Sequence, residues 1–136
     1  MTNREIAGVL EEMGEILQIG GASHFRVRAF HMAAETIRGL PESLETVRQR
    51  QPLEELPHVG EGIARRIEEL LDTGQCVEHQ EMIDGPYGGL LEVTRLPGIG
   101  PKRARSLSEE LGIRSLDELE QAAREGRIAE VAGFGK

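Results

Sequence analysis

One stretch decides the fold of this 136-residue chain: Leu96-Pro97-Gly98-Ile99-Gly100-Pro101-Lys102-Arg103-Ala104. A proline followed by two glycines predicts a tight turn, because glycine adopts positive φ angles that strain other residues. Leucine, proline, an aliphatic residue, a glycine and an alanine recur in the same order in an earlier stretch, Leu56-Pro57-His58-Val59-Gly60-Glu61-Gly62-Ile63-Ala64. The chain therefore contains a repeat.

Each copy is predicted to be a tip that joins two helical segments. The helix after the tip begins with unpaired backbone N–H groups and with the positive end of its dipole, so a phosphate oxygen finds hydrogen-bond donors and a favourable field in one place. Such contacts ignore base identity and give no direct sequence information.

The composition indicates a small intracellular module. Hydrophobic residues make up 38% of the chain, enough for one domain or for two helical subdomains with modest cores. Cys76 is the only cysteine, so no disulfide framework exists within the chain. No apolar run approaches the roughly 18 residues of a membrane span. The N-terminus has no apolar signal region and instead resembles the start of a helix, with Thr2 or Asn3 as its cap. We expect a cytoplasmic protein that does not bind membranes.

The charge distribution matters more than the net charge of −8, which by itself disfavours a nucleic-acid partner. Four basic residues and no acidic one lie beside the second tip, namely Arg95, Lys102, Arg103 and Arg105. A second basic segment, between residues 20 and 40, contains Arg26, Arg28 and Arg38 against Glu35. Solvated helix faces of mixed sign are the alternative interpretation of both segments.

Hydrophobic periodicity predicts an all-α fold without strands. Helices are expected from about Ile6 to Leu17, from Phe25 to Leu40, around Leu44 and Val47, from Ile63 to Leu71 before Gly74, and through Leu107 and Leu111, followed by a capping box at Ser115–Glu118.

Turn-forming residues at 84–89 predict a boundary between two small helical subdomains. The first, 1–84, has a hairpin at 56–71, and the second, 85–136, has a hairpin at 94–111. Residues 131–136 resemble the start of a third tip, so we expect the chain to be a fragment of a longer one.

Together with the segment Phe25-Arg26-Val27-Arg28-Ala29-Phe30 and with Ala33-Ala34, the two tips resemble the amino-terminal region of family X DNA polymerases. This is the family of DNA polymerase beta, and its bacterial branch is the closer match. The resemblance covers essentially the whole chain and implies paired helix-hairpin-helix motifs. It also implies a non-sequence-specific module that holds the backbone and the 5′-phosphate side of gapped, nicked or primer-template DNA in base-excision-type repair.

The resemblance also implies the site residues. In that family the first hairpin holds the downstream strand and the second the primer strand. By position, the backbone amides that would do so here are those of His58, Gly60, Gly62, Gly98, Gly100, Lys102 and Arg103. A monovalent cation, Na⁺ or K⁺, would bind to the carbonyls of Leu56, Val59, Thr94, Leu96 and Ile99. The side chains that would contact the 5′-phosphate or other parts of the DNA are Arg26, Arg28, Phe30, Arg66 and Arg105. Core packing is the alternative for Phe25 and Phe30.

The chain departs from the family at three positions. Some members remove a sugar-phosphate remnant through a Schiff-base lysine, but Arg66 stands at the matching position, and arginine is a poor carbonyl nucleophile because it stays protonated. We therefore expect no efficient lyase activity, unless another residue supplies it. In the first hairpin His58 replaces a common glycine and Glu61 is acidic, so the second hairpin matches the family more closely.

No catalytic centre is predicted in this chain. Nucleotidyl transfer needs clustered carboxylates for two metal ions, whereas the aspartates, Asp72, Asp84 and Asp117, are scattered, and the histidines lack a zinc-ligand spacing. Polymerase or exonuclease activity, and the Mg²⁺ it needs, would belong to domains downstream of Lys136; this chain needs no cofactor. We expect a monomer whose partners are DNA and its own downstream domains. The alternatives are a protein-docking scaffold whose acidic face, 109–130, binds a basic partner, and a generic DNA-binding scaffold.

Overall fold

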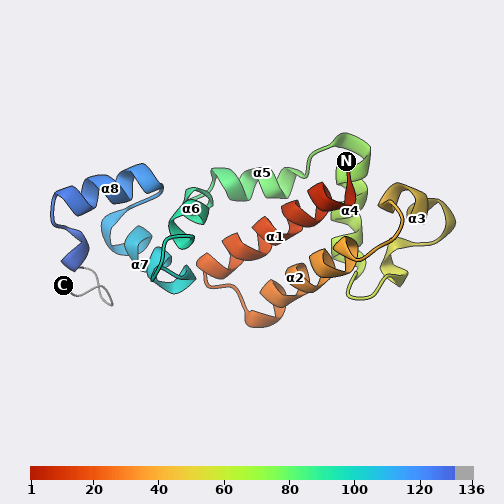
Figure 1. The fold of residues 1–136 in the computed structure, drawn as a ribbon, viewed down its shortest axis with the longest axis horizontal. Helices are drawn as coiled ribbons and strands as arrows, with labels where there is room; N and C mark the ends of the chain where they lie inside the picture. Colours follow the sequence, from red (N-terminus) through yellow and green to blue (C-terminus); the bar gives the residue numbers. More distant parts are fainter. Residues whose placement is uncertain (131–136) are drawn as a thin grey trace. The chain divides into compact units, whose positions relative to one another are not determined.

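A computed structural model of the chain describes residues 1–130, which form an all-helical structure without strands. The all-α prediction is thus confirmed for these residues, and the predicted third tip at 131–136 lies outside them. The helices, shown in Figure 1, are α1 (Asn3–Ile19), α2 (His24–Arg38), α3 (Leu44–Arg50), η1 (Leu53–Glu55), α4 (Glu61–Thr73), α5 (Val77–Asp84), η2 (Gly88–Leu90), α6 (Leu91–Thr94), α7 (Pro101–Leu111), α8 (Leu116–Arg124) and η3 (Ile128–Glu130). None of these helices is both long and apolar enough to cross a lipid bilayer.

The chain forms two compact units. Unit 1 consists of residues 1–14 and 24–80, and unit 2 consists of residues 15–23 together with the chain from Glu81 onward. The chain passes from unit 1 to unit 2 between Gln80 and Glu81, and unit 2 also includes the end of α1, a segment that the sequence analysis places in the first domain.

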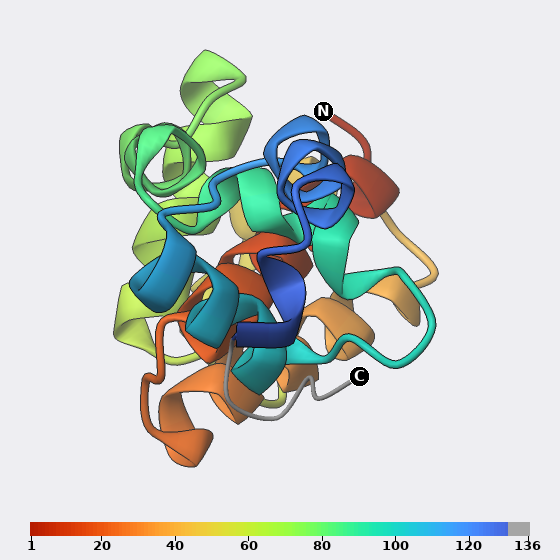
Figure 2. The same cartoon turned by 90° about the vertical axis from the view of Figure 1, so that its left-hand side faces the viewer.

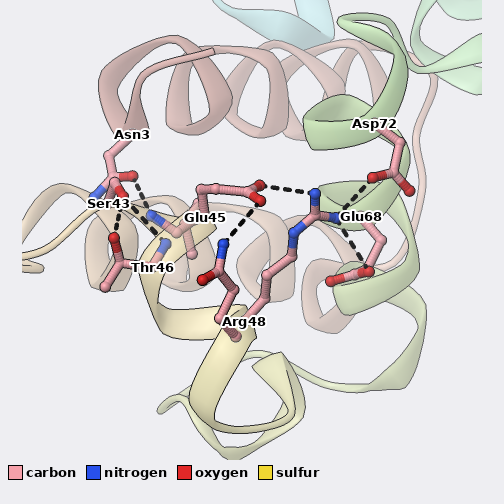
Figure 3. A network of polar contacts seen from close by, with 9 residues as sticks. Asn3, Ser43, Glu45, Thr46, Arg48, Glu68 and Asp72 are labelled. Carbon is pink, nitrogen blue, oxygen red and sulfur yellow. Dashed lines mark hydrogen bonds and ion pairs between the residues drawn. The ribbon is translucent and has the colours of Figure 1, made fainter.

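The first helix of unit 1 begins with a reciprocal cap. Thr2 Oγ1 accepts a hydrogen bond from Glu5 N at 3.1 Å, and Glu5 Oε1 accepts one from Thr2 N at 2.8 Å. The backbone hydrogen bond from Thr2 is also the main reason why the pKa of Glu5 is lowered. Of the two predicted caps, Thr2 is therefore the cap, while Asn3 Oδ1 accepts a hydrogen bond from Leu44 N at 2.9 Å and so connects α1 to α3 (Figure 3).

The core of unit 1 is built from one face of each of its main helices. Figure 1 shows α1 and α2 side by side, and a Cβ at Gly14 would lie 3.2 Å from Cβ of Phe30. Phe30 is 3% exposed, so core packing is the correct alternative for this residue, whereas Phe25 is 83% exposed. The other buried side chains of these helices include Ile6, Leu10, Met13, Ile37, Leu44, Val47, Ile63, Ile67 and Leu70.

An arginine joins α3 to α4 in unit 1. The guanidinium of Arg48 lies 2.7 Å from Glu45, 2.8 Å from Asp72 and 3.4 Å from Glu68, which places it among three carboxylates (Figure 3). The hydrogen bond to Asp72 is the main cause of the raised pKa of Arg48. The network neutralises this arginine, so it adds little to any basic surface of unit 1.

The core of unit 2 includes the last turn of α1. Ile16 and Ile19 belong to the same buried cluster as the apolar residues of the following helices, which include Leu90, Val93, Ala104, Leu107, Ile113, Leu119 and Ala122. Gly112, with φ 68°, ends α7 and leads to Ser115, whose Oγ caps α8 by accepting a hydrogen bond from Glu118 N at 3.2 Å. Helices α7 and α8 are blue segments of the ribbon in Figure 2.

The turn-forming residues at 84–89 are packed within unit 2. A Cβ built on Gly88 would lie 2.0 Å from the carbonyl oxygen of Ile83, a separation that real structures do not allow. Gly88 also begins the 3-10 helix η2, so this glycine serves close backbone packing, and the predicted boundary segment lies inside unit 2.

Candidate nucleic-acid interface

The first tip, hairpin 1 (residues 56–64), is a tight turn followed by α4. Val59 N donates a hydrogen bond to the carbonyl of Leu56 at 3.1 Å, with Pro57 at the second position of the turn. His58, at the third position, has φ 63°. A proline followed by a residue of positive φ is the pattern of a type II turn, which usually has glycine at the third position.

The second tip, hairpin 2 (residues 96–104), has the same turn. Ile99 N donates to the carbonyl of Leu96 at 3.1 Å, and Gly98 after Pro97 has φ 83°. The repeat in the sequence is therefore a repeat in the structure. Hairpin 1 differs in that a histidine takes the strained position that glycine occupies in hairpin 2.

The second glycine of each tip is in an extended conformation. Gly60 has φ −87° and ψ −178°, and Gly100 has φ −92° and ψ −175°, so the prediction of positive φ is wrong for these two residues. Both are N-cap residues without a side-chain capping bond, and a Cβ on either would meet no atom within 4 Å. Glycine here leaves the start of α4 and of α7 open, with the first-turn N–H groups available to a ligand.

Basic side chains surround hairpin 2. Within residues 1–130, Arg95 and Lys102 are exposed and form no ion pair. Arg103 Nη1 donates a hydrogen bond to the carbonyl of Gly98 at 2.7 Å and so braces the tip. Arg105 lies 3.6 Å from Glu109, and its Nη1 would be 1.8 Å from a Cβ on Gly21, so part of its guanidinium is already engaged within unit 2.

Hairpin 1 has a different electrostatic setting. Glu61 is exposed at the first position of α4, where a carboxylate competes with a phosphate for the open N–H groups. Arg66 points to α5, where its Nη2 lies 2.8 Å and 3.0 Å from the two carboxylate oxygens of Glu78, and its Cζ lies 5.2 Å from the ring centre of Phe30. Because Phe30 is in the core and Arg66 has this partner, the structure places neither of them as a free contact for DNA.

The arginines of the basic segment in α2 have different surroundings in the fold. Arg38 forms an ion pair with Glu11, at 2.6 Å and 2.7 Å, which lowers the pKa of that carboxyl group. Arg26 and Arg28 are exposed, and Arg26 also interacts with its surroundings. The mixed-sign alternative therefore holds for Arg38, while Arg28 forms no ion pair with any residue of the described chain.

A surface feature that the sequence analysis missed lies next to hairpin 1. We call it the His58 hollow: about 240 Å³, lined by Phe25, Arg28, Ala29, Met32 and His58. A second hollow of about 440 Å³ adjoins it, since Met32 and His58 line both. Helix geometry could have separated the two phenylalanines, because residues five apart point to different faces of a helix.

No group of three or more histidine, cysteine, aspartate or glutamate side chains within residues 1–130 is arranged to hold a metal ion. His79 is instead buried and forms a hydrogen bond with Glu12 Oε1 at 2.8 Å. Burial also raises the pKa of the Cys76 thiol, which makes it less reactive.

Comparisons with known proteins agree with this geometry. A helix-hairpin-helix domain model matches residues 1–76, and a SAM-like helix-hairpin-helix tandem model matches residues 90–136. The chain is 28% identical over its whole length to DNA polymerase/3′-5′ exonuclease PolX of Bacillus subtilis (strain 168), of which it covers 23%. It is 31% identical over 97% of its length to human DNA-directed DNA/RNA polymerase mu, of which it covers 26%. The chain thus spans about a quarter of the length of these two relatives. Their similarity to the chain agrees with the resemblance to family X DNA polymerases. The chain belongs to the helix-hairpin-helix domain family.

Proposed function

We propose that this chain is the non-sequence-specific DNA-binding module of a family X DNA polymerase. The observation that supports it most is the repeated tip: two type II turns with equal 3.1 Å hydrogen bonds, each followed by an extended glycine and an uncapped helix start. Both relatives named above are polymerases by name. On this proposal the DNA-directed polymerase activity of the parent protein, and its Mg²⁺ ions, belong to other domains.

Hairpin 2 is the stronger DNA site in this proposal. The N–H groups of Lys102 and Arg103 lie in the first turn of α7, next to that of the N-cap residue Gly100, and Pro101 at its first position has no N–H to leave unpaired. The Lys102 and Arg95 side chains add positive charge beside these donors. Together they would hold a backbone phosphate without reading the bases.

A monovalent cation would complete each hairpin. Leu56 and Leu96 each accept one turn hydrogen bond through the backbone carbonyl, which leaves a second lone pair on each oxygen. Carbonyl oxygens suit hard cations. We propose that Na⁺ or K⁺ binds to the carbonyls of Leu56 and Val59 in hairpin 1 and to those of Thr94, Leu96 and Ile99 in hairpin 2.

The preferred substrate in this proposal is gapped DNA with a 5′-phosphate, held on the side of Arg26 and Arg28. We expect fluorescence anisotropy to show tighter binding to the phosphorylated gap than to the same gap without the phosphate or to intact duplex. Arg26→Ala is expected to weaken binding to the phosphorylated gap by about tenfold, since a charge-assisted hydrogen bond contributes about 1.5–3 kcal/mol.

Arg38→Gln is the matched control, because Arg38 lies on the same helix but is paired with Glu11. It is expected to leave the affinity unchanged. Equal and weak binding to all three DNAs, across a salt series, would contradict this preference for a phosphorylated gap and favour generic backbone binding or a protein-docking scaffold.

We also predict that the chain has no efficient lyase activity. Arg66 stands at the position that matches the Schiff-base lysine, its guanidinium lies 2.8 Å from Glu78, and arginine is a poor carbonyl nucleophile. Borohydride reduction in the presence of abasic DNA should therefore give no covalent adduct. The chain should be acetylated at its N-terminus so that only side chains are tested, and Arg66→Lys is the comparison variant; an adduct with the unmodified sequence would show that another residue acts.

A further inference from the structure

His58 stands at an unusual position for its residue type. It has φ 63°, where an L-residue is strained by about 1–2 kcal/mol, and its counterpart Gly98 avoids that cost. Its side chain is exposed and forms no hydrogen bond or ion pair within residues 1–130. No side-chain hydrogen bond or ion pair within residues 1–130 therefore offsets the backbone strain of a histidine at this position.

The surroundings of the imidazole suit an anionic ligand with an attached ring. Arg28 and Phe25 line the His58 hollow with it, and Phe25 is 83% exposed, the largest exposed apolar side chain of α2. An arginine and an imidazolium both donate hydrogen bonds to phosphate oxygens, and an exposed aromatic face accepts a stacked base. This combination fits a nucleotide unit of a DNA strand better than it fits a peptide.

We propose that the imidazolium of His58, together with Arg28, binds a phosphodiester of the DNA backbone, so that hairpin 1 holds DNA more tightly as the pH falls. This inference rests on the proposed DNA-binding function and deepens it. Hairpin 1 uses a titratable side chain where hairpin 2, with Gly98, uses backbone groups and permanently charged side chains.

The charge of the ligand sets the sign of the effect. The charged residues around His58 include Arg28, which lines the same hollow, Glu35, which lines the adjoining hollow, and Glu61 at the start of α4. A bound phosphodiester adds negative charge and so favours the imidazolium over the neutral ring. Binding therefore takes up a proton, and affinity increases as the pH is lowered through the range in which imidazole titrates, about pH 8 to 5.

The test measures the affinity for a duplex with a single-nucleotide gap and 5′-hydroxyl ends, so that no terminal phosphate titrates in the same range. For the unmodified sequence we expect about tenfold tighter binding at about pH 5.5 than at about pH 8, and a plot of log affinity against log salt that is steeper by about 1 at the lower pH. His58→Asn keeps the turn, because asparagine tolerates positive φ, and removes the charge.

His58→Asn is expected to lose this pH dependence, and His58→Arg to bind at about pH 8 as the unmodified sequence does at about pH 5.5. The other histidines are present in all three proteins, so their contribution cancels in the comparison. Binding that depends on pH equally in the unmodified sequence and in His58→Asn would overturn the inference alone. Absence of binding at every pH would overturn the proposed function and the inference with it.

Discussion

Replacing Gly88 with alanine is expected to destabilise unit 2 by about 3 kcal/mol or more. The new Cβ would lie 2.0 Å from the carbonyl oxygen of Ile83 and 2.5 Å from its carbonyl carbon, so backbone must move on one side or the other. Thermal unfolding followed by circular dichroism should show a Tm lower by on the order of 10–20 °C for the transition of this unit.

Gly8→Ala is the matched control for this prediction. Gly8 lies in α1 with no atom within 4 Å of an added Cβ, so alanine there is expected to stabilise the protein by about 0.5–1 kcal/mol through helix propensity. A Gly88→Ala protein with an unchanged Tm would show that the backbone around Ile83 and Gly88 adjusts more easily than its packing indicates.

The second large effect is expected at hairpin 2. Gly100→Val should weaken DNA binding by tenfold or more, because its branched side chain would occupy the open space beside the first-turn N–H groups and would keep a phosphate away, at about 1.5–3 kcal/mol for each lost charge-assisted hydrogen bond. The backbone at Gly100 is extended, a conformation that valine adopts, and no atom lies within 4 Å of the new Cβ. Folding should therefore change by about 1 kcal/mol at most, through the poorer N-cap.

Anisotropy titrations of the variant against gapped DNA would test this prediction, with circular dichroism to show that the helices remain. Gly60→Val makes the same change in hairpin 1, where the backbone geometry is the same. Its effect on affinity is expected to be smaller, because the acidic Glu61 follows Gly60 in hairpin 1, whereas the basic Lys102 lies near Gly100 in hairpin 2. Equal losses at the two hairpins would contradict the proposed difference between them.

Features that depend on neighbouring residues in the sequence were predictable. The cap at Thr2, the helix end at Gly74 with φ 79°, and the cap at Ser115 all follow from local hydrogen bonding and backbone preference. The helix α5 was not predicted, because only His79 of its eight residues is buried and its sequence shows no clear apolar face.

Features that depend on distant residues were not predictable. The pairing of Arg66 with Glu78, and its position over Phe30, require three helices to meet. The repeat shows that hairpin 1 and hairpin 2 share a turn, yet only the backbone angles reveal that His58 takes the strained position. Likewise, α1 is one continuous amphipathic helix in the sequence, and nothing in its periodicity shows where its side chains change from one core to the other.

The double membership of α1 affects how the chain can be divided. Ile16 and Ile19 fill part of the core around Leu90 and Leu107, although residues 24–80 of unit 1 separate them from these leucines along the chain. During synthesis the core of unit 2 must remain incomplete until its later helices have been made, and closing so long a loop costs entropy. A cut between the two matched regions would leave one half with exposed isoleucines and the other with a gap in its core. The two hairpins are copies of one turn, but the halves of the chain that contain them are not interchangeable modules.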